Sequence, residues 1–320
     1  MSLYKNTCIL VLAYNVEDYI EKVISELLDL DLQIFVIDDK SKDNTKNILQ
    51  SINMESNKNI EIIENKKNIG AGESLKKLIT LAKKNKFDFF IKVDGDGQFL
   101  IEDVKKIYDI SRNQEFDFIK SNRFWSEGII GKIPFHRLVG NLIATLMMQI
   151  STGTSMLFDP LNGLFGGKTE LVNYLDSKLY PKRYGYPFFF SVISTNNYLK
   201  ICQFNNTIKY ANEKSNLKTL RVFFTLIKIT VYSYFVKIKF KITKDLLQFS
   251  AFLDLIFIVS FGLFLYTLGK TFSYHFISFD DGNQGQWLIL SVAFLFSSVF
   301  CFVKSFNIES VFKNENISTL

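Results

Sequence analysis

Apolar segments alternate with charged segments over the first 215 residues, and this alternation constrains the fold more than any other feature. Strands that alternate with helices form a mostly parallel, doubly wound sheet with right-handed crossovers, so we expect an α/β domain of that kind. The expected strands are Thr7–Ala13, Gln33–Ile37, Asn59–Ile63, Phe87–Val93 and Phe116–Lys120, and the expected helices are Val16–Leu30, Ser41–Ile52, Gly72–Asn85 and Ile101–Arg112.

Polar side chains follow three of the expected strands, at the point where each strand ends. They are Asn15, Asp38, Asp39, Asp94 and Asp96. Ligands of open α/β sheets bind outside the carboxyl ends of the strands, which meet at one edge. The sequence therefore predicts a single site built from these residues.

The stretch Asp94-Gly95-Asp96-Gly97-Gln98 carries two carboxylates one residue apart after a buried strand. Carboxylates suit Mg²⁺ or Mn²⁺, which complete their shells with water and substrate phosphates, and Gln98 adds a neutral oxygen. An Asp-x-Asp pair alone is more often a solvated turn. Its place after a buried strand favours a divalent cation site on Asp94, Asp96 and Gln98.

Two further turns carry residues suited to a nucleotide. The stretch VIDDKSKDNT at 36–45 places Asp38 and Asp39 where an acid can accept hydrogen bonds from a ribose or a base. The turn Asn68–Gly72 contains two glycines, which allow a backbone to approach a ligand closely. Each turn taken alone is more often structural.

Residues 138–158 contain no charge, and a hydropathy scan would mark them as a membrane span. The run holds many polar residues, and a crossing there would put residues 159–215 on the opposite side of the membrane from the sheet. We therefore expect a helix that lies at an interface or packs on the core.

Two later segments predict membrane spans, at about residues 249–268 and 287–303. Residues 218–244 before them hold seven Lys/Arg and no acid, which favours an anionic lipid surface and not nucleic acid. By the positive-inside rule the spans form a hairpin with both ends cytoplasmic. Asp254 is the one charge in the first span, so we expect it to snorkel or to meet a lysine of another subunit.

The motifs, taken in order, resemble those of family 2 glycosyltransferases, which have the GT-A nucleotide-sugar-binding fold. The resemblance rests on Leu10–Asn15, the 36–45 stretch, the Asn68–Gly72 turn and Asp94–Gln98. It narrows to the polyprenyl-phosphate glycosyltransferases, the group of dolichyl-phosphate mannose synthase and bacterial undecaprenyl-phosphate glucosyltransferases. The narrower resemblance is carried by Ser121–Phe124, Arg137, Asp159–Phe165, Arg183–Phe189 and Ser215–Leu217.

This resemblance implies four parts: a cytosolic catalytic domain at 1–217, a basic amphipathic juxtamembrane segment at 218–247, two transmembrane helices within 248–304, and a cytosolic tail at 305–320. It implies a multi-pass homo-oligomer in a bacterial inner (plasma) membrane, which transfers one sugar from a UDP- or GDP-sugar to polyprenyl phosphate. The reaction is expected to be inverting and metal-dependent, with Mg²⁺ or Mn²⁺ and with the acceptor phosphate as nucleophile. The implied donor contacts are Ala13, Tyr14, Asn15, Asp38, Asp39, Asn68, Gly70, Asp94 and Gly95, and the implied catalytic residues are Asp94, Asp96, Arg123, Arg137 and Asp159.

Several of these roles have alternatives. Arg123 and Arg137 suit a lipid phosphate because a guanidinium binds phosphate oxygens as a fork, but both could pair with surface acids. Asp159 could orient sugar hydroxyls, orient one arginine or serve as a turn. His136 is more typical of a packing or interface residue than of an acid–base group.

Two other functions remain open at the level of sequence. A family 2 transferase that extends a lipid-linked saccharide would share the metal site, with less need for the arginines. A non-catalytic membrane scaffold would have no use for the intact Asp94/Asp96 pair. No Gln-x-x-Arg-Trp motif is present, which argues against a processive polysaccharide synthase.

Overall fold

The computed structural model describes residues 6–55, 59–113, 115–124, 135–206, 219–243, 247–273 and 284–320. The chain divides into two compact units. The first comprises residues 1–151, 156–231 and 316–320, and the second comprises 152–155 and 232–315.

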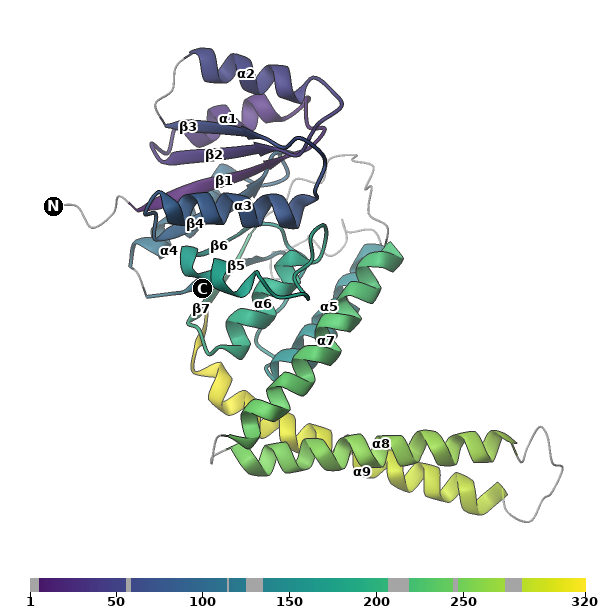
Figure 1. The fold of residues 1–320 in the computed structure, drawn as a ribbon. Helices are drawn as coiled ribbons and strands as arrows, with labels where there is room; N and C mark the ends of the chain where they lie inside the picture. Colours follow the sequence, from purple (N-terminus) through teal and green to yellow (C-terminus); the bar gives the residue numbers. More distant parts are fainter. Residues whose placement is uncertain are drawn as a thin grey trace. The chain divides into compact units, whose positions relative to one another are not determined.

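The first unit is built on an eight-stranded sheet of order β3-β2-β1-β4-β6-β5-β7-β8 (Figure 1). All neighbouring strands are parallel except β6, which runs antiparallel to both β4 and β5. The expected mostly parallel α/β sheet is thus confirmed. The strands are β1 Thr7–Ala13, β2 Gln33–Asp38, β3 Ile60–Glu64, β4 Phe89–Asp94, β5 Phe118–Asn122, β6 Phe165–Lys168, β7 Ile201–Asn205 and β8 Ile317–Thr319.

Helices cover both faces of this sheet, so alternate residues of a central strand enter different cores. In β1, Leu10 packs in the core that includes α3 and α6, whereas Ile9 and Val11 pack in the core that includes α1 and α4. Burial on both faces explains why β1 is a continuous apolar run. The helices of this part are α1 Ile20–Leu28, α2 Thr45–Glu55, α3 Ala71–Lys84, α4 Ile101–Arg112, α5 Phe135–Thr152, the 3₁₀ helix η2 Thr169–Tyr174 and α6 Tyr186–Asn196.

Strands β6, β7 and β8 and helix α6 were not among the expected elements. Strand β6 has the sequence Phe-Gly-Gly-Lys, which is short and weak in strand propensity. A Cβ on Gly166 would lie 2.7 Å from the Phe89 ring and 2.8 Å from Ile107. The glycine is therefore required by packing between neighbouring elements, which a local pattern does not reveal.

Helix α5 has the two-sided character expected of a core-packing or interfacial helix. One side is buried and includes Ala144 and Met148. The other side exposes large apolar side chains, namely Val139, Leu142, Ile143, Leu146 and Ile150. Helix α7 (Thr219–Ile242) likewise places Leu226 and Ile229 in the core of the first unit and exposes Phe223 and Phe224.

The second unit contains two helices, Gln248–Ser273 (α8) and Gly285–Asn314 of α9 (Gln284–Asn314), that are long and apolar enough to cross a membrane. They lie side by side (Figure 1), and Ser291 donates a hydrogen bond to Thr267 between them at 3.0 Å. Both helices extend beyond the expected windows of 249–268 and 287–303. Hydropathy marks only the apolar part of a helix, whereas the backbone hydrogen bonding continues into the polar ends.

Asp254 finds its partner within its own chain, so the expectation of snorkelling or of a lysine from another subunit was wrong. Its carboxylate lies 2.8 Å from Lys241 Nζ and accepts hydrogen bonds from Tyr234 at 3.0 Å and Ser305 at 2.6 Å. Lys241 also meets Glu309 at 2.7 Å. Glu309 pairs in turn with Lys237 and Lys313, at 3.1 and 2.9 Å. These buried ion pairs join α7, α8 and α9.

Candidate active site

The carboxyl ends of β1, β2 and β4 meet at one edge of the sheet. Ala13 lies opposite Asp38, and Leu12 lies opposite Asp94. Beyond the strands, Asp39 N donates to Ala13 O and Gly95 N donates to Leu12 O, both at 2.9 Å. The loops that carry the predicted donor and metal residues therefore begin side by side.

Asn15 and Asp38 hold the first two of these loops together. Asn15 adopts a left-handed conformation with φ 53°, and its side chain accepts a hydrogen bond from Lys42 N at 2.8 Å. The Asn15 N–H donates to the Ser41 hydroxyl at 3.0 Å, and Ser41 N donates to Asp38 at 3.1 Å. Tyr14 next to Asn15 is exposed and can contact a ligand.

Asp39 binds the chain's own Asn68–Gly72 turn. Its buried carboxylate accepts hydrogen bonds from Ile69 N at 2.9 Å, Gly70 N at 2.7 Å and the Asn65 side chain at 2.9 Å. These three hydrogen bonds fix the turn against β2. The predicted contact of Asp39 with a ribose or base stays a prediction.

The two glycines of this turn lie against residues 181–183 of the same chain, where the sequence had suggested a nucleotide. A Cβ on Gly72 would lie 2.0 Å from Pro181 O, and one on Gly70 (φ 96°) would lie 2.6 Å from Lys182 O. Arg183 donates to the Asn68 side chain at 2.9 Å. The start of the Arg183–Phe189 segment therefore lies against the turn, and this contact requires glycine. The predicted donor contacts of Asn68 and Gly70 stay predictions.

Asp94 lies above a buried lysine that sequence reasoning missed. Lys92 is fully buried, and its Nζ lies 2.5 Å from Asp94 Oδ2 and 5.3 Å from the centre of the Tyr186 ring. A Cβ on Gly163 would lie 2.5 Å from the same carboxylate oxygen. The available signal was a lysine within the apolar strand Phe-Phe-Ile-Lys-Val-Asp, two residues before Asp94 and hence on the same face.

The turn after β4 suits a cation that is shared with a substrate. Asp96 is half-buried and accepts a hydrogen bond from Gln98 N at 3.2 Å. Asp94, Asp96 and Gln98 provide hard oxygen donors, the kind that Mg²⁺ and Mn²⁺ prefer. In the part of the chain that the structure describes, no group of three or more His, Cys, Asp or Glu could hold a metal ion. A cation here would need ligands from water or from the substrate.

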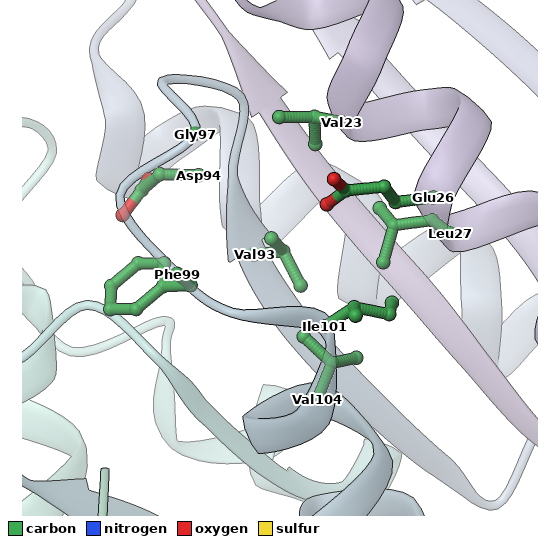
Figure 2. Close-up of a pocket in the computed structure, with 9 residues that line it drawn as sticks. All are labelled: Val23, Glu26, Leu27, Val93, Asp94, Gly97, Phe99, Ile101 and Val104. Atoms are coloured by element: carbon green, nitrogen blue, oxygen red, sulfur yellow. The ribbon is translucent and has the colours of Figure 1, made fainter. Parts of the chain in front are cut away.

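Figure 2 shows the surroundings of a small cavity bordered by Asp94 and Gly97. The cavity volume is about 10 Å³. Most of its lining is apolar and comes from α1, β4 and α4, with the Glu26 carboxylate at one side. Small-molecule sites usually have roughly 300–1,000 Å³. The cavity is therefore too small and too apolar to be the whole of a nucleotide-sugar site.

Arg123 forms a fork on the buried carboxylate of Asp159. Arg123 Nε donates to Asp159 Oδ2 at 2.7 Å, Nη2 donates to Oδ1 at 2.6 Å, and the Arg123 N–H adds a bond of 3.0 Å. Asp159 is fully buried, has φ 51°, and also accepts from Asn162 at 3.2 Å. Of the three roles considered for Asp159, this geometry favours orientation of an arginine.

A second buried lysine, also missed, holds the backbone of the Asp159 loop. Lys120 Nζ donates to Phe158 O, to Asp159 O at 3.3 Å and to the Gln203 side chain at 3.3 Å. Burial lowers the pKa of Lys120 to about 8, while the nearby Asp159 charge opposes that shift. The Phe158 and Asp159 carbonyl oxygens stabilise the buried ammonium group of Lys120. These hydrogen bonds connect the Asp159 loop to β5.

Arg137 lies in the first turns of α5 and is half-buried. The structure gives its guanidinium no hydrogen bond or ion pair with another described residue. The His136 side chain and the Ser215–Leu217 motif lie outside the part that the structure describes. In the structure, Asp159 is thus paired with Arg123. That Arg123 and Arg137 both bind the lipid phosphate stays a prediction.

Comparison with known proteins identifies the family. The sequence model of glycosyl transferase family 2 matches residues 8–173, just over half of the 320 residues. The chain belongs to glycosyl transferase family 2. The observed sheet agrees with the GT-A fold expected for members of this family.

Two relatives of this family 2 member are similar over part of the chain. An uncharacterized protein, MJ0544, of Methanocaldococcus jannaschii is 30% identical over 140 residues, which cover 43% of this chain and 59% of that protein. The chain thus matches less than two thirds of that relative's length. A UDP-N-acetylglucosamine–dolichyl-phosphate N-acetylglucosaminyltransferase of Methanococcus voltae is 25% identical over 192 residues, 55% of this chain and 74% of that enzyme.

Among solved structures, the crystal structure of S. aureus TarS residues 1–349 in complex with UDP aligns with 97% of this chain and 90% of that chain. The TM-score is 0.48 and the sequence identity is 13%. This similarity is too low to inform on substrate or mechanism.

Proposed function

We propose that this family 2 enzyme transfers one sugar from a nucleotide-sugar donor to a polyprenyl phosphate at the surface of a membrane. The observation that carries the proposal is the loop Asp159–Gly163. Its first residue holds Arg123, and its last lies against the Asp94 carboxylate. A predicted acceptor residue and a predicted donor residue are therefore positioned by one short segment.

On the donor side, the carboxyl edge of β1, β2 and β4 offers Ala13, Tyr14, Asn15, Asp38 and Asp39 to the nucleoside. Asp94, Asp96 and Gln98 would hold Mg²⁺ or Mn²⁺, which would neutralise the charge that develops on the leaving diphosphate. Asp94 retains 28% exposure of its side chain, so a ligand can reach it. The UDP-sugar named for the Methanococcus voltae relative makes UDP the first nucleotide to test.

On the acceptor side, a lipid monophosphate is largely ionised at neutral pH because its second pKa is about 6. It needs no strong general base, and direct attack on the anomeric carbon inverts the configuration. Arg137 would bind the phosphate oxygens, and Arg123 would do so from a position set by Asp159. The acceptor named for the Methanococcus voltae relative, dolichyl phosphate, supports a lipid phosphate over a free sugar.

Attachment to a membrane is supported by α8 and α9 and by the exposed apolar side chains of α5 and α7. We propose a multi-pass protein whose catalytic unit is cytoplasmic, in the inner membrane if the source is bacterial. The exposed basic residues of α7, namely Arg221, Lys228 and Lys239, would face anionic lipid headgroups, whereas Lys237 and Lys241 are buried in ion pairs. A homo-oligomer is part of this proposal.

The test is transfer of radiolabel from a panel of UDP- and GDP-sugars to short-chain undecaprenyl or dolichyl phosphate in membranes that contain the protein. A lipid-soluble product that mild acid converts to free sugar supports the proposal. Label that appears only when a lipid-linked saccharide is supplied would indicate an enzyme that extends such saccharides. Failure to hydrolyse or transfer any sugar would favour a scaffold.

A further inference from the structure

Lys92 is a buried charge that the reaction chemistry above does not use. Its side chain is fully buried in β4, beneath a carboxylate that is 28% exposed. Apart from Asp94 and the Tyr186 ring, the described residues offer its ammonium group no hydrogen-bond acceptor. An isolated buried ammonium is strongly unfavourable, so Lys92 depends on Asp94 as its counter-charge.

The arrangement also fixes the direction of the Asp94 carboxylate. Lys92 Nζ holds Oδ2 from beneath, and the bare Cα of Gly163 lies against the same oxygen. A Cβ at Gly163 would be 2.5 Å from Oδ2 and 3.2 Å from the Lys92 ammonium, so a side chain there would disturb both groups. The carboxylate is therefore oriented before any ligand arrives.

The lysine changes the charge that a cation would encounter at this edge. Asp94 and Asp96 together carry two negative charges, and Lys92 cancels one of them. A divalent cation beside Asp94 would also be repelled by the ammonium group, in a region where burial weakens solvent screening. A nucleoside diphosphate brings additional negative charge and oxygen ligands, which would offset this repulsion.

We propose that Lys92 is a positioning residue whose ammonium makes cation binding at Asp94 and Asp96 depend on the nucleoside diphosphate. The inference rests on the proposed function, because it assumes that a nucleotide-sugar and a cation share this edge. The cation and the nucleotide would then bind as a pair. By reciprocity, each would raise the affinity of the other by the same factor.

The test measures Mn²⁺ binding to the full-length protein in detergent by electron paramagnetic resonance, with and without UDP or GDP. The data are corrected for the complex of Mn²⁺ with free nucleotide. In the wild type, we expect a saturating nucleotide to raise Mn²⁺ affinity at least about tenfold. In Lys92→Met, which retains the length of the side chain without its charge, Mn²⁺ should bind at least about tenfold more tightly than to wild type when nucleotide is absent.

Lys168→Met is the matched control, because Lys168 lies opposite Phe89, at the end of β4 away from Asp94. Its ammonium group pairs with Asp117 at 2.6 Å, so its loss should leave nucleotide-free Mn²⁺ affinity unchanged. The double variant Lys92→Met/Asp94→Ala should lose the gain in Mn²⁺ affinity that Lys92→Met shows.

The inference is overturned if wild type binds Mn²⁺ equally well without nucleotide, a result that needs no variant to fold. It is also overturned if Lys92→Met folds and binds Mn²⁺ as wild type does, an outcome that leaves the proposed transferase function intact. Absence of Mn²⁺ binding even with UDP or GDP would overturn both this inference and the cation site of the proposed function.

Discussion

Two buried lysines support the two acidic groups of the site in different ways. Lys92 pairs with the side chain of Asp94, whereas Lys120 binds backbone carbonyls and leaves the Asp159 carboxylate to Arg123. Asp94 stays partly exposed, and Asp159 is completely buried. Asp94 can therefore accept a ligand directly, whereas Asp159 can influence a ligand only through Arg123.

Replacement of either predicted metal ligand should abolish transfer. For Asp96→Ala we expect a loss of at least about a hundredfold in turnover with unchanged thermal unfolding. Asp94→Ala should lose activity and also roughly 3 kcal/mol of stability, because Lys92 is left buried without its counter-charge. Asp109→Ala, at an exposed position of α4, is the control and should retain both properties. Near-wild-type turnover of Asp96→Ala in EDTA would rule out the metal assignment.

The two arginines should differ in a way that the sequence alone did not predict. Arg123→Ala leaves the buried Asp159 carboxylate without its main partner, so it should lower the unfolding free energy by roughly 3–5 kcal/mol as well as impair transfer. Arg137→Ala should leave stability unchanged. If Arg137 binds the lipid phosphate, its loss removes a contact of about 1.5–3 kcal/mol, or roughly ten- to a hundredfold in kcat/KM for the lipid.

Unfolding curves, nucleotide calorimetry and the apparent KM for a short-chain polyprenyl phosphate separate these effects. Arg137→Lys should rescue lipid use only in part, because an ammonium lacks the planar fork. Loss of nucleotide affinity with normal lipid affinity in Arg137→Ala would assign this arginine to the donor side.

Among the helices, α3 shows how the fold limits where a diphosphate can bind. The start of a helix is often an anion site because its first N–H groups lack partners. In α3, Gly72 N donates to Arg183 O at 3.2 Å and Glu73 N donates to Lys182 O at 2.9 Å. These donors are occupied by the chain's own carbonyls. The turn after β4 is the better place for the phosphates.

Substitution of Gly72 should therefore act on stability. The Cβ of Gly72→Ala would lie 2.0 Å from Pro181 O, a backbone atom that cannot move without its loop, so we expect a loss of roughly 1–3 kcal/mol in urea unfolding. Gly140→Ala on α5 is the matched control. Nothing lies within 4 Å of its added Cβ, and alanine should stabilise the helix by roughly 0.5–1 kcal/mol. Equal effects of the two substitutions would contradict the packing explanation.

Over the whole molecule, the first unit takes residues from both ends of the chain. Strand β8 pairs with β7, and Ile317 enters the same core as Leu226 and Ile229 of α7. A cut after residue 217, at the expected domain boundary, would remove all three of these side chains. The helices α8 and α9 are thus inserted between α7 and the last strand of the sheet.

A soluble catalytic fragment should accordingly need both segments. We expect a chain in which a Gly/Ser linker replaces residues 232–315 to unfold at a higher temperature than a chain ending at 231, and the chain ending at 217 to be the least stable. Thermal unfolding and UDP binding by calorimetry compare the three. Equal stability of the 1–217 fragment would show that α7 and β8 contribute nothing to this core.

The sequence was sufficient for the elements whose patterns are local. Strands β1–β5 are short apolar runs, helices α1–α4 have an apolar period of 3.6 residues, and all lie within a few residues of their expected positions. The placement of acids after β2 and β4 followed from the same patterns, because parallel strands end at one edge. Two apolar segments near the end of the chain similarly predicted α8 and α9.

Other features depended on contacts between residues far apart in the chain. Insertion of β6 between β4 and β5, the return of β8 to the sheet, and the contact of residues 181–183 with Gly72 leave no periodic signal in their own segments. The partners of Asp254 and Arg123 likewise come from other elements, 13 and 36 residues away. A charge within an apolar segment can be recognised in a sequence. Its partner cannot, because a buried charge needs an opposite charge nearby and the tertiary packing decides which one is within reach.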